Sequence, residues 1–340
     1  MCAYRVIGIE SSPYAIKVRA VMRYRRIPHH WVGRMPQFFA ETAHVRPLLM
    51  PVVQFPDGEY RTDSTPIIRT LERLHNGREI TPPDPVFALL SDIIEDMADE
   101  WLTKILFHYR FSHDADTRFA AAWVMDDAHP LMTSPDLADM AARFAERQRS
   151  RMHLVGCTPV NASLLEGSFM EILAALSPVV ATDRFLFGTR PSLADFGLFA
   201  QLHILGTDPT PRAVMAKRAP RLWSWTGRVN DLSGIDGAWN ESAGGRPATP
   251  EPAVHTLLSL AGRYYLPYLH AHTEAAQAGD EGVSVDIAGH RYEQPIFRYH
   301  LKCHDYLLHQ YRAVTENDRS RADEYLAQSG CLEYFAGNLT

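Results

Sequence analysis

Residues 4–19 read YRVIGIESSPYAIKVR, a short apolar run followed by two serines, a proline and the start of an amphipathic pattern. The apolar, β-branched run over 4–9 predicts a buried strand. Ser12 is a residue type that caps helix N-termini and Pro13 suits the first helical position, so the sequence predicts that a helix begins here. The apolar face of this helix is formed by Ile16, Ala20, Val21 and Tyr24. The hydroxyls of Ser11 and Ser12 are therefore expected between a strand and the positive end of a helix.

Short strand and helix patterns continue up to residue 80. The strand patterns cover 29–32, 52–55 and 59–62, and the helix patterns cover 37–43 and 64–76. The turn PDG between the last two strand patterns predicts a hairpin, and Asp63-Ser64 before Thr-Pro predicts a capped helix start. The order β-α-β-(α)-β-β-α predicts an α/β domain over 1–80, with a mixed four-stranded sheet flanked by helices.

The rest of the chain is predicted to be mainly helical. The linker TPPDP at 81–85 cannot continue a helix or a strand, because three of its five residues are prolines. The periodicity over 86–239 predicts an all-α helical bundle, in which Ser192 and Asp195 have the spacing of a capping box. A break rich in glycine and proline then separates 253–340, where we expect a long helix, a β-hairpin and one or two further helices.

The composition of the 340-residue chain is that of an ordinary globular protein, with 46% hydrophobic and 22% charged residues. A formal net charge of −6 argues against non-specific nucleic-acid binding, although the surplus of basic residues in 1–80 favours a small anionic ligand. The four cysteines form no C-x-x-C pair, which fits a reducing compartment. No signal-peptide pattern and no run of about 18 apolar residues is present, so we expect a cytoplasmic protein without a membrane partner.

The last segment contains stretches rich in histidine and aromatic residues. Four potential metal ligands in one predicted helix are His300, Cys303, His304 and His309. Neither an H-E-x-x-H pattern nor paired cysteines accompany them, so a packed or solvated helix face is favoured and no metal is predicted. The stretches GRYYLPYLHAH and FRYHLKCHDYLLHQY could line a pocket, but core packing is the default interpretation.

Four features, in this order along the chain, resemble the cytosolic glutathione transferases of the bacterial, serine type. They are the serine pair before Pro13-Tyr14, the triplet Met50-Pro51-Val52, the acidic-Ser pair Asp63-Ser64, and the box formed by Ser192 and Asp195. The resemblance covers about 1–235. It implies a thioredoxin-like N-terminal domain that binds glutathione, an all-helical second domain, and a homodimer.

The resemblance also implies how the thiol of glutathione is activated. A free thiol of this kind has a pKa of about 8.5, so only a few per cent is thiolate at pH 7. Ser12 stands where the redox branches of the family have a cysteine, and its hydroxyl would donate a hydrogen bond to the thiolate sulfur. Ser11 is the neighbour that could substitute for it or support it. The alternative for Ser12 is a helix N-cap with no further role.

The remaining parts of glutathione would bind in an extended form. Ser64 and the N-terminus of its helix would bind the γ-glutamyl carboxylate, and Asp63 or the partner subunit would accept the ammonium group. A cis bond before Pro51 would present the backbone of Val52 to the cysteinyl part. An ordinary helix start and a trans proline are the respective alternatives. The predicted glutathione-binding residues are Pro13, His44, Arg46, Met50, Pro51, Val52, Asp63 and Ser64, with His44 and Arg46 as candidates for the glycine carboxylate.

A dithiol redox reaction is excluded at this helix, because Ser12 and Ala15 occupy the two redox positions. Conjugation, reductive dehalogenation or isomerisation of a small hydrophobic electrophile remain, with glutathione as co-substrate. Residues 253–340 have no counterpart in the usual transferase; they could cover the mouth of the active site, extend the dimer interface or bind something else. The alternative function is therefore a non-catalytic binding or interaction protein that acts through this extension.

Overall fold

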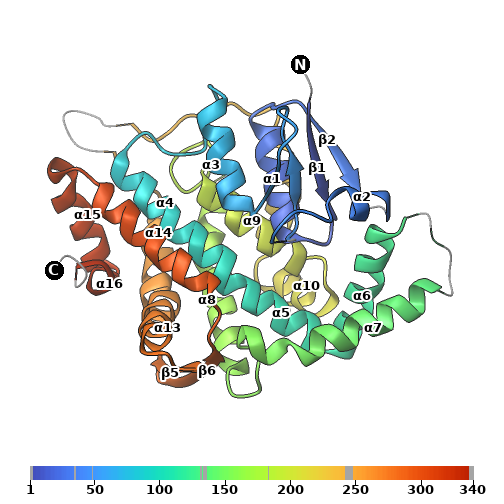
Figure 1. Cartoon of the computed structure of the whole chain (residues 1–340). Coiled ribbons are helices and arrows are strands. Elements are labelled where there is room, and N and C mark those ends of the chain that lie inside the picture. The colour runs from blue at the N-terminus through green and yellow to red at the C-terminus, as the bar shows by residue number, and fades with distance from the viewer. Residues whose placement is uncertain are drawn as a thin grey trace.

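The computed structural model describes residues 3–33, 36–47, 49–130, 132, 136–182, 184–241 and 248–336. A small sheet with two helices packed against it occupies one corner of the molecule, and helices make up most of the remainder (Figure 1). The predicted fold class, a thioredoxin-like α/β domain followed by a helical domain, is confirmed.

The N-terminal part contains the predicted order of strands and helices. Its elements are β1 (Tyr4–Gly8), α1 (Pro13–Tyr24), β2 (His29–Gly33), α2 (Pro36–Glu41), β3 (Val52–Gln54), β4 (Tyr60–Thr62) and α3 (Ser64–Leu74). The sheet order is β2-β1-β3-β4, with β2 parallel to β1 and the other pairs antiparallel. Val6 pairs with Trp31 on one side and with Val53 on the other, so β1 is central. The predicted bounds are off by a residue or two at several ends, where helices and strands fray.

Helix α1 is buried more completely than its amphipathic pattern predicts. It packs against the sheet and α3, and its other side packs against α9 (Leu193–Leu205). Even Lys17 and Arg19 are buried, because both faces of the helix are covered. The first turn of α1 is thus held rigidly between the two parts of the molecule.

The helical part begins directly after the linker. Besides α9, its elements are α4 (Pro85–Met97), the π-helical turn η1 (Ala98–Leu102), α5 (Thr103–Ser112), α6 (Asp114–Ala128), α7 (Asp136–Ser150), the 3-10 turn η2 (Met152–Val155), α8 (Ala162–Ala181), α10 (Pro209–Arg218) and α11 (Pro220–Val229). The box at the start of α9 is formed, with Ser192 and Asp195 bonded to each other's backbone. Within the described ranges α8 alone is long and apolar enough to cross a membrane, and 56% of its apolar window is buried in the fold, as in a core helix.

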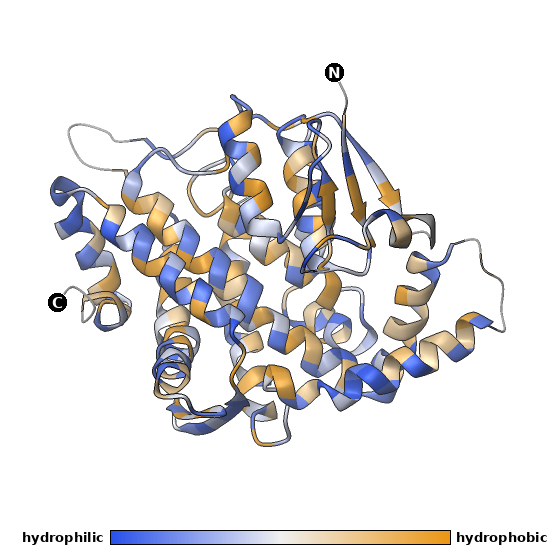
Figure 2. Cartoon of the chain, viewed as in Figure 1, coloured by the Kyte–Doolittle hydropathy of each residue, from blue (hydrophilic) through white to orange (hydrophobic). Residues whose placement is uncertain are grey.

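The C-terminal segment, defined here as residues 252–336, is part of the same core. Its elements are α12 (Pro252–Leu260), the π-helical turn η3 (Ala261–Tyr265), α13 (Leu266–Ala278), the hairpin β5 (Gly282–Ile287) and β6 (His290–Pro295), α14 (Tyr299–Ala313), α15 (Glu316–Gln328) and the short α16 (Glu333–Ala336). The hairpin and the long helical stretch are as predicted, and three helices follow where one or two were expected. Hydrophilic and hydrophobic residues alternate along these helices (Figure 2), as in helices with one buried face. Helices α12, α14 and α15 all pack against α4.

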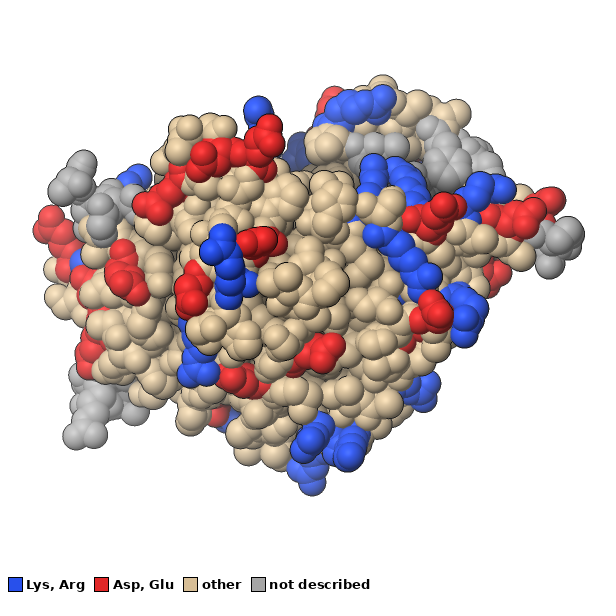
Figure 3. All heavy atoms as spheres, turned by 90° about the horizontal axis from the view of Figure 1, so that it is seen from below, with Lys and Arg blue, Asp and Glu red and all other residues tan. Residues whose placement is uncertain are grey.

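The surface charge is mixed on the face shown in Figure 3. Lysine and arginine side chains lie interspersed with aspartate and glutamate, and uncharged residues cover most of this face. The formal charge of −6 is therefore not gathered into one acidic patch there.

Candidate functional site

A cavity of about 350 Å³ lies where the first turns of α1 and α3 meet α5 and the C-terminal segment. Four of the predicted site residues line it, namely Ser12, Met50, Asp63 and Ser64. The other lining residues are Tyr14, Leu49, Asp99, Glu100, Thr103, Lys104, Phe107, Val155, Gln294, Phe297, Tyr299 and His300. We call this space the Ser12 cavity.

Ser12 is the N-cap residue of α1. Its backbone is extended, with φ −101° and ψ 117°, and its Oγ accepts a hydrogen bond from the Ala15 backbone N–H at 3.4 Å. A distance of 3.4 Å is long for such a bond. Because Oγ is the acceptor, the hydroxyl hydrogen stays available to donate to a group in the cavity. The N-cap alternative and the thiolate role are therefore compatible in this geometry.

Ser11 does not line the cavity. It is buried, its backbone N–H donates to Asp127 Oδ2 at 2.8 Å, and its carbonyl accepts from Arg110 at 3.2 Å. Arg110 is in turn held by two hydrogen bonds to the buried Asp208, at 2.7 and 2.9 Å. These contacts fasten the turn that carries Ser12, so the two neighbouring serines have different surroundings.

The Met50–Pro51 peptide bond is cis, as the sequence analysis expected. Met50 lines the Ser12 cavity, whereas Pro51 is buried and Val52 begins β3. Pro13, at the first position of α1, is buried as well. The Val52 side chain packs against Ile7 and so contributes to the core.

Asp63 and Ser64 form the start of α3. Asp63 has φ +76°, a conformation that costs a non-glycine residue on the order of 1–3 kcal/mol and that is found most often at functional sites. Its side chain makes no cap hydrogen bond; Oδ2 accepts instead from the Tyr299 hydroxyl at 2.8 Å. Burial raises the pKa of the Asp63 carboxyl, and the Tyr299 hydrogen bond opposes that rise. Ser64 is buried and lines the same cavity.

His44 and Arg46 lie elsewhere. They line a different space of about 480 Å³ beside the β3–β4 turn. The Arg46 guanidinium donates to the carbonyls of Ala43 and Val45 at 2.7 and 2.8 Å, and the His44 ring contacts Tyr60 edge-on. The structure does not bring these two residues to the Ser12 cavity.

Comparisons with protein families agree with this arrangement. The family described as the glutathione S-transferase N-terminal domain matches residues 6–79, and the one described as the C-terminal domain matches residues 133–228. The chain belongs to the glutathione S-transferase superfamily.

Several solved structures are similar to this chain at low sequence identity. A β-etherase from Sphingobium sp. strain SYK-6 is 18% identical with a TM-score of 0.48, and the match covers 67% of this chain and 95% of the etherase. A glutathione S-transferase from Methylobacterium radiotolerans JCM 2831, in complex with glutathione sulfonate, is 22% identical with a TM-score of 0.43. The match covers 71% of this chain and 99% of that transferase. A glutathione transferase family member from Pseudomonas fluorescens Pf-5 with bound glutathione is 15% identical with a TM-score of 0.40. The match covers 68% of this chain and 96% of that protein. A search of curated proteins gave no match.

The C-terminal segment of this transferase lies outside both family matches, yet it forms one wall of the Ser12 cavity. Gln294 comes from β6, Phe297 follows it, and Tyr299 and His300 begin α14. Phe297, Tyr299 and His300 belong to an aromatic stretch for which the sequence analysis took core packing as the default and a pocket lining as the alternative. The density of aromatic residues was the available signal, but nothing local in the sequence connects this stretch or Gln294 to Ser12.

A buried ionic network supports the floor of the transferase cavity. Lys17 of α1 donates to Glu95 and, at 2.6 Å, to Asp99 Oδ2. Burial acts to lower the pKa of Lys17, but the two carboxylates outweigh it and the pKa is raised. Burial raises the pKa of Asp99 and of Glu100 to about 7 each. Both acids belong to η1, and π-helical turns occur frequently at functional sites.

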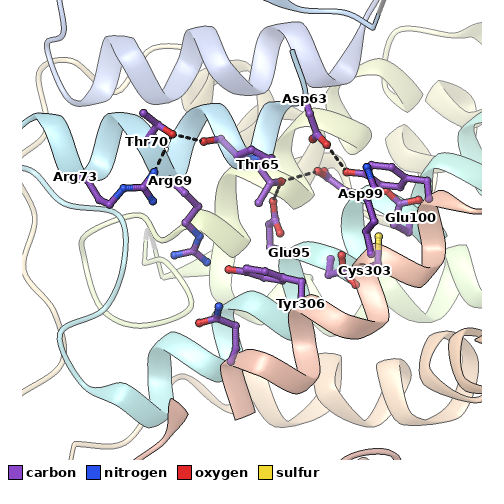
Figure 4. Close-up of a pocket in the computed structure, with 15 residues that line it drawn as sticks. Asp63, Thr65, Arg69, Thr70, Arg73, Glu95, Asp99, Glu100, Cys303 and Tyr306 are labelled. Carbon is purple, nitrogen blue, oxygen red and sulfur yellow. Dashed lines mark hydrogen bonds between the residues drawn. The ribbon is translucent and has the colours of Figure 1, made fainter. Parts of the chain in front are cut away.

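A second space of about 490 Å³ adjoins the Ser12 cavity, between α3, α4 and α14. Asp63, Asp99, Glu100 and Tyr299 line both spaces. In Figure 4, Asp63, Asp99 and Glu100 lie at one end of this second space, and Arg69 and Arg73 lie at the other. The hydrogen bond from Tyr299 to Asp63 therefore stands in the wall between the two.

Proposed function

We propose that this transferase binds glutathione in the Ser12 cavity and that Ser12 stabilises its thiolate for attack on a small hydrophobic electrophile. The observation that carries the proposal is the convergence of Ser12, Met50, Asp63 and Ser64, which are far apart in sequence, on one cavity. Their convergence is what a single extended ligand requires.

The chemistry asked of Ser12 is modest. Lowering the thiol pKa by one unit requires about 1.4 kcal/mol, and a hydrogen bond to a charged group contributes roughly 1.5–3 kcal/mol. The N-terminus of α1 adds a partial positive charge on the same side. One hydroxyl is therefore enough to make much of the bound thiol ionised near neutral pH.

The proposed ligand contacts follow from the two helix starts. Ser64 and the free N–H groups of α3 would bind the γ-glutamyl carboxylate, and Asp63 would accept the ammonium group. The backbone of Val52, which follows the cis bond before Pro51, would pair with the cysteinyl part, and Pro13 would keep Ser12 at the start of α1. For the glycine carboxylate, His44 and Arg46 remain the proposed residues only if glutathione extends out of the cavity toward the β3–β4 turn.

The proposal extends to the type of reaction, the oligomeric state and the cellular compartment. Conjugation, dehalogenation and isomerisation all begin with the same thiolate. The family resemblance supports a homodimer, which sedimentation at micromolar concentration would test. The free thiols of Cys157, Cys303 and Cys331 support a reducing compartment such as the cytoplasm.

The test compares Ser12→Ala with Ser11→Ala. We expect the wild type to bind glutathione at millimolar concentration, and Ser12→Ala to raise the pKa of the bound thiol, seen as lost thiolate absorbance near neutral pH. Ser11→Ala should change that absorbance less. Equal effects of the two substitutions, or none, would refute the role of Ser12. A wild type that does not bind glutathione would instead favour the alternative, a binding protein that acts through the C-terminal segment.

A further inference from the structure

The Ser12 cavity is lined by a buried lysine that has no role in the thiolate stabilisation proposed above. Lys104 of α5 is 1% exposed and lines the cavity. Its Nζ donates to Gln294 Oε1 at 2.6 Å and lies 4.3 Å from the ring centroid of Tyr268. An ammonium group has three N–H donors, and within the described ranges Gln294 is its one hydrogen-bond acceptor. Donor capacity therefore remains at the cavity wall.

Gln294 is held so that it presents Lys104. Its Oε1 accepts from Lys104 and also from the Tyr292 hydroxyl at 2.7 Å, which fixes the orientation of the amide. Its Nε2 is buried and interacts with the Tyr268 hydroxyl. The amide is thus held on both sides, and it fixes the position of the Lys104 ammonium group.

The rest of the cavity limits what a ligand of Lys104 can be. Apolar side chains form much of its wall, namely Leu49, Met50, Phe107, Val155 and Phe297. Ser12, Asp63 and Ser64, on the other side of the same space, are the groups proposed to bind glutathione, so the apolar wall around Lys104 is left for the electrophile. The cavity thus suits a neutral, apolar molecule that carries an oxygen acceptor.

Resting on the function proposed above, we propose that Lys104, held by Gln294, donates its proton to the carbonyl oxygen of an α,β-unsaturated ketone while glutathione adds to it. The thiolate sulfur bonds to the β-carbon, and the electron pair of the carbon–carbon double bond moves toward the carbonyl. The oxygen takes the proton from the Lys104 ammonium and gives an enol. Neutral Lys104 regains a proton from water, and the enol tautomerises to the saturated ketone, so no other reactant is needed.

The electrostatic surroundings of Lys104 suit a proton donor. Burial lowers the pKa of Lys104 to about 8, so it is mostly protonated at neutral pH and yet more acidic than a free lysine. Five titratable groups interact electrostatically with Lys104. They are Glu100 of η1, Cys157, His272 of α13, and His300 and Cys303 of α14. Burial lowers the pKa of both histidines and raises that of both thiols, so these four groups are neutral near pH 7.

The experiment measures two electrophiles with one set of variants. The first is 4-phenyl-3-buten-2-one, in which charge develops on a carbonyl oxygen; the second is benzyl bromide, which loses bromide and needs no proton. We expect Lys104→Met to lower kcat/KM for the enone by about 10²–10³-fold, as removal of an oxyanion donor does, and for the bromide by less than about 3-fold. The matched control is Lys302→Met, since Lys302 is an exposed lysine of α14 that lines only the adjoining space. It should change neither rate.

Gln294→Leu provides a second test if Lys104→Met does not fold. It leaves Lys104 in place but removes its acceptor, and we expect a loss of about 5–20-fold on the enone alone. Equal losses on both electrophiles, or an unchanged enone rate in both variants, would overturn the role of Lys104. A wild type that forms bound thiolate but does not add it to the enone would overturn this inference and leave the proposed function standing. A wild type that forms no thiolate would overturn both.

Discussion

One wall of the Ser12 cavity is formed by the first turns of α1 and α3, and the other is formed by the C-terminal segment. The two walls depend on interactions of different range in the sequence. Ser12 and Ser64 stand in the first turns of α1 and α3, where a few neighbouring residues determine both the helix start and the direction of its free N–H groups. Tyr299 and Gln294 reach the same cavity from the C-terminal segment, and their partners Asp63 and Lys104 lie 236 and 190 residues away in the sequence. Local chemistry builds one wall, and long-range packing builds the other.

The comparison suits different roles for the two walls of the cavity. The wall made from helix starts offers backbone donors and hydroxyls, which suit the constant part of a reaction, the glutathione molecule. The wall made by the C-terminal segment offers Phe297, Gln294 and His300, which do not take part in either helix start. On the proposed function, the first wall would bind glutathione and stabilise its thiolate, and the second would select the electrophile.

The largest expected effect comes from cutting the connection between the two regions. Trp101 of η1 is fully buried; its ring lies 6.1 Å from that of Tyr264 and 5.7 Å from that of Tyr292, and its Nε1 donates to Ser168 at 3.0 Å. We expect Trp101→Ala to lower the free energy of unfolding by about 3–5 kcal/mol, measured by urea denaturation. Trp223→Ala, at a position 44% exposed, is the matched control and should cost less. Equal losses, or separate unfolding transitions for the two regions, would contradict a shared core.

The same division explains what could be predicted from the sequence. The strand before Ser12, the cap at Ser12, the cis bond before Pro51 and the start of α3 at Ser64 all depend on adjacent residues, and the structure has each of them. The capping box at Ser192 was predictable for the same reason. Pattern and residue type at one place carried enough information for these features.

The wall formed by the C-terminal segment could not be predicted from local sequence patterns. Whether Tyr299 contacts Asp63 depends on how α14 packs against α4, and the helical periodicity of α14 is the same whichever partner it covers. Arg46 shows the same limit: its type suggested an anion contact, but the sequence does not report that its guanidinium donates to carbonyls of its own loop and lines a different space. Side-chain direction across a core is a tertiary property, and no local pattern reports it.

A second prediction concerns the pH dependence of stability at Glu100, which is bonded to His300 across the boundary between the regions. Burial raises the pKa of Glu100 to about 7, above the usual value of about 4.3, so the folded protein holds this proton more tightly than the unfolded chain. The resulting stabilisation is complete below about pH 4 and is lost as the pH rises through about 7. Glu100→Gln keeps the acceptor for His300 and cannot ionise.

We therefore expect Glu100→Gln to gain stability relative to the wild type between about pH 5 and about pH 8, by roughly 1–3 kcal/mol. Denaturation curves of both proteins across that range give the difference, in which the titration of all other groups largely cancels. A difference that stays constant with pH, or that falls as the pH rises, would contradict the assignment.

A third prediction separates two roles for Tyr299. If its hydroxyl orients the Asp63 carboxylate toward the ammonium of glutathione, Tyr299→Phe should raise the Kd for glutathione about 3–10-fold, an effect of about 1 kcal/mol. Calorimetric titration measures it. Tyr306→Phe is the matched control, because the Tyr306 hydroxyl donates to Asp92 and lines only the adjoining space. Tighter binding by Tyr299→Phe would show instead that this hydroxyl competes with the ligand for Asp63.

The smallest expected effect is the stability loss of Ser12→Ala, which is judged against a second serine cap in the other part of the transferase. Both accept a backbone N–H at 3.4 Å, Ser12 from Ala15 and Ser192 from Asp195, but Ser192 also donates to the Asp195 carboxylate at 2.6 Å in a buried box. Ser192→Ala should therefore cost about 1–2 kcal/mol of stability and Ser12→Ala only about 0.5 kcal/mol, measured by thermal and urea unfolding. A loss at Ser12 as large as that at Ser192 would contradict the weak cap bond and show that the Ser12 Oγ caps α1 as firmly as Ser192 caps α9.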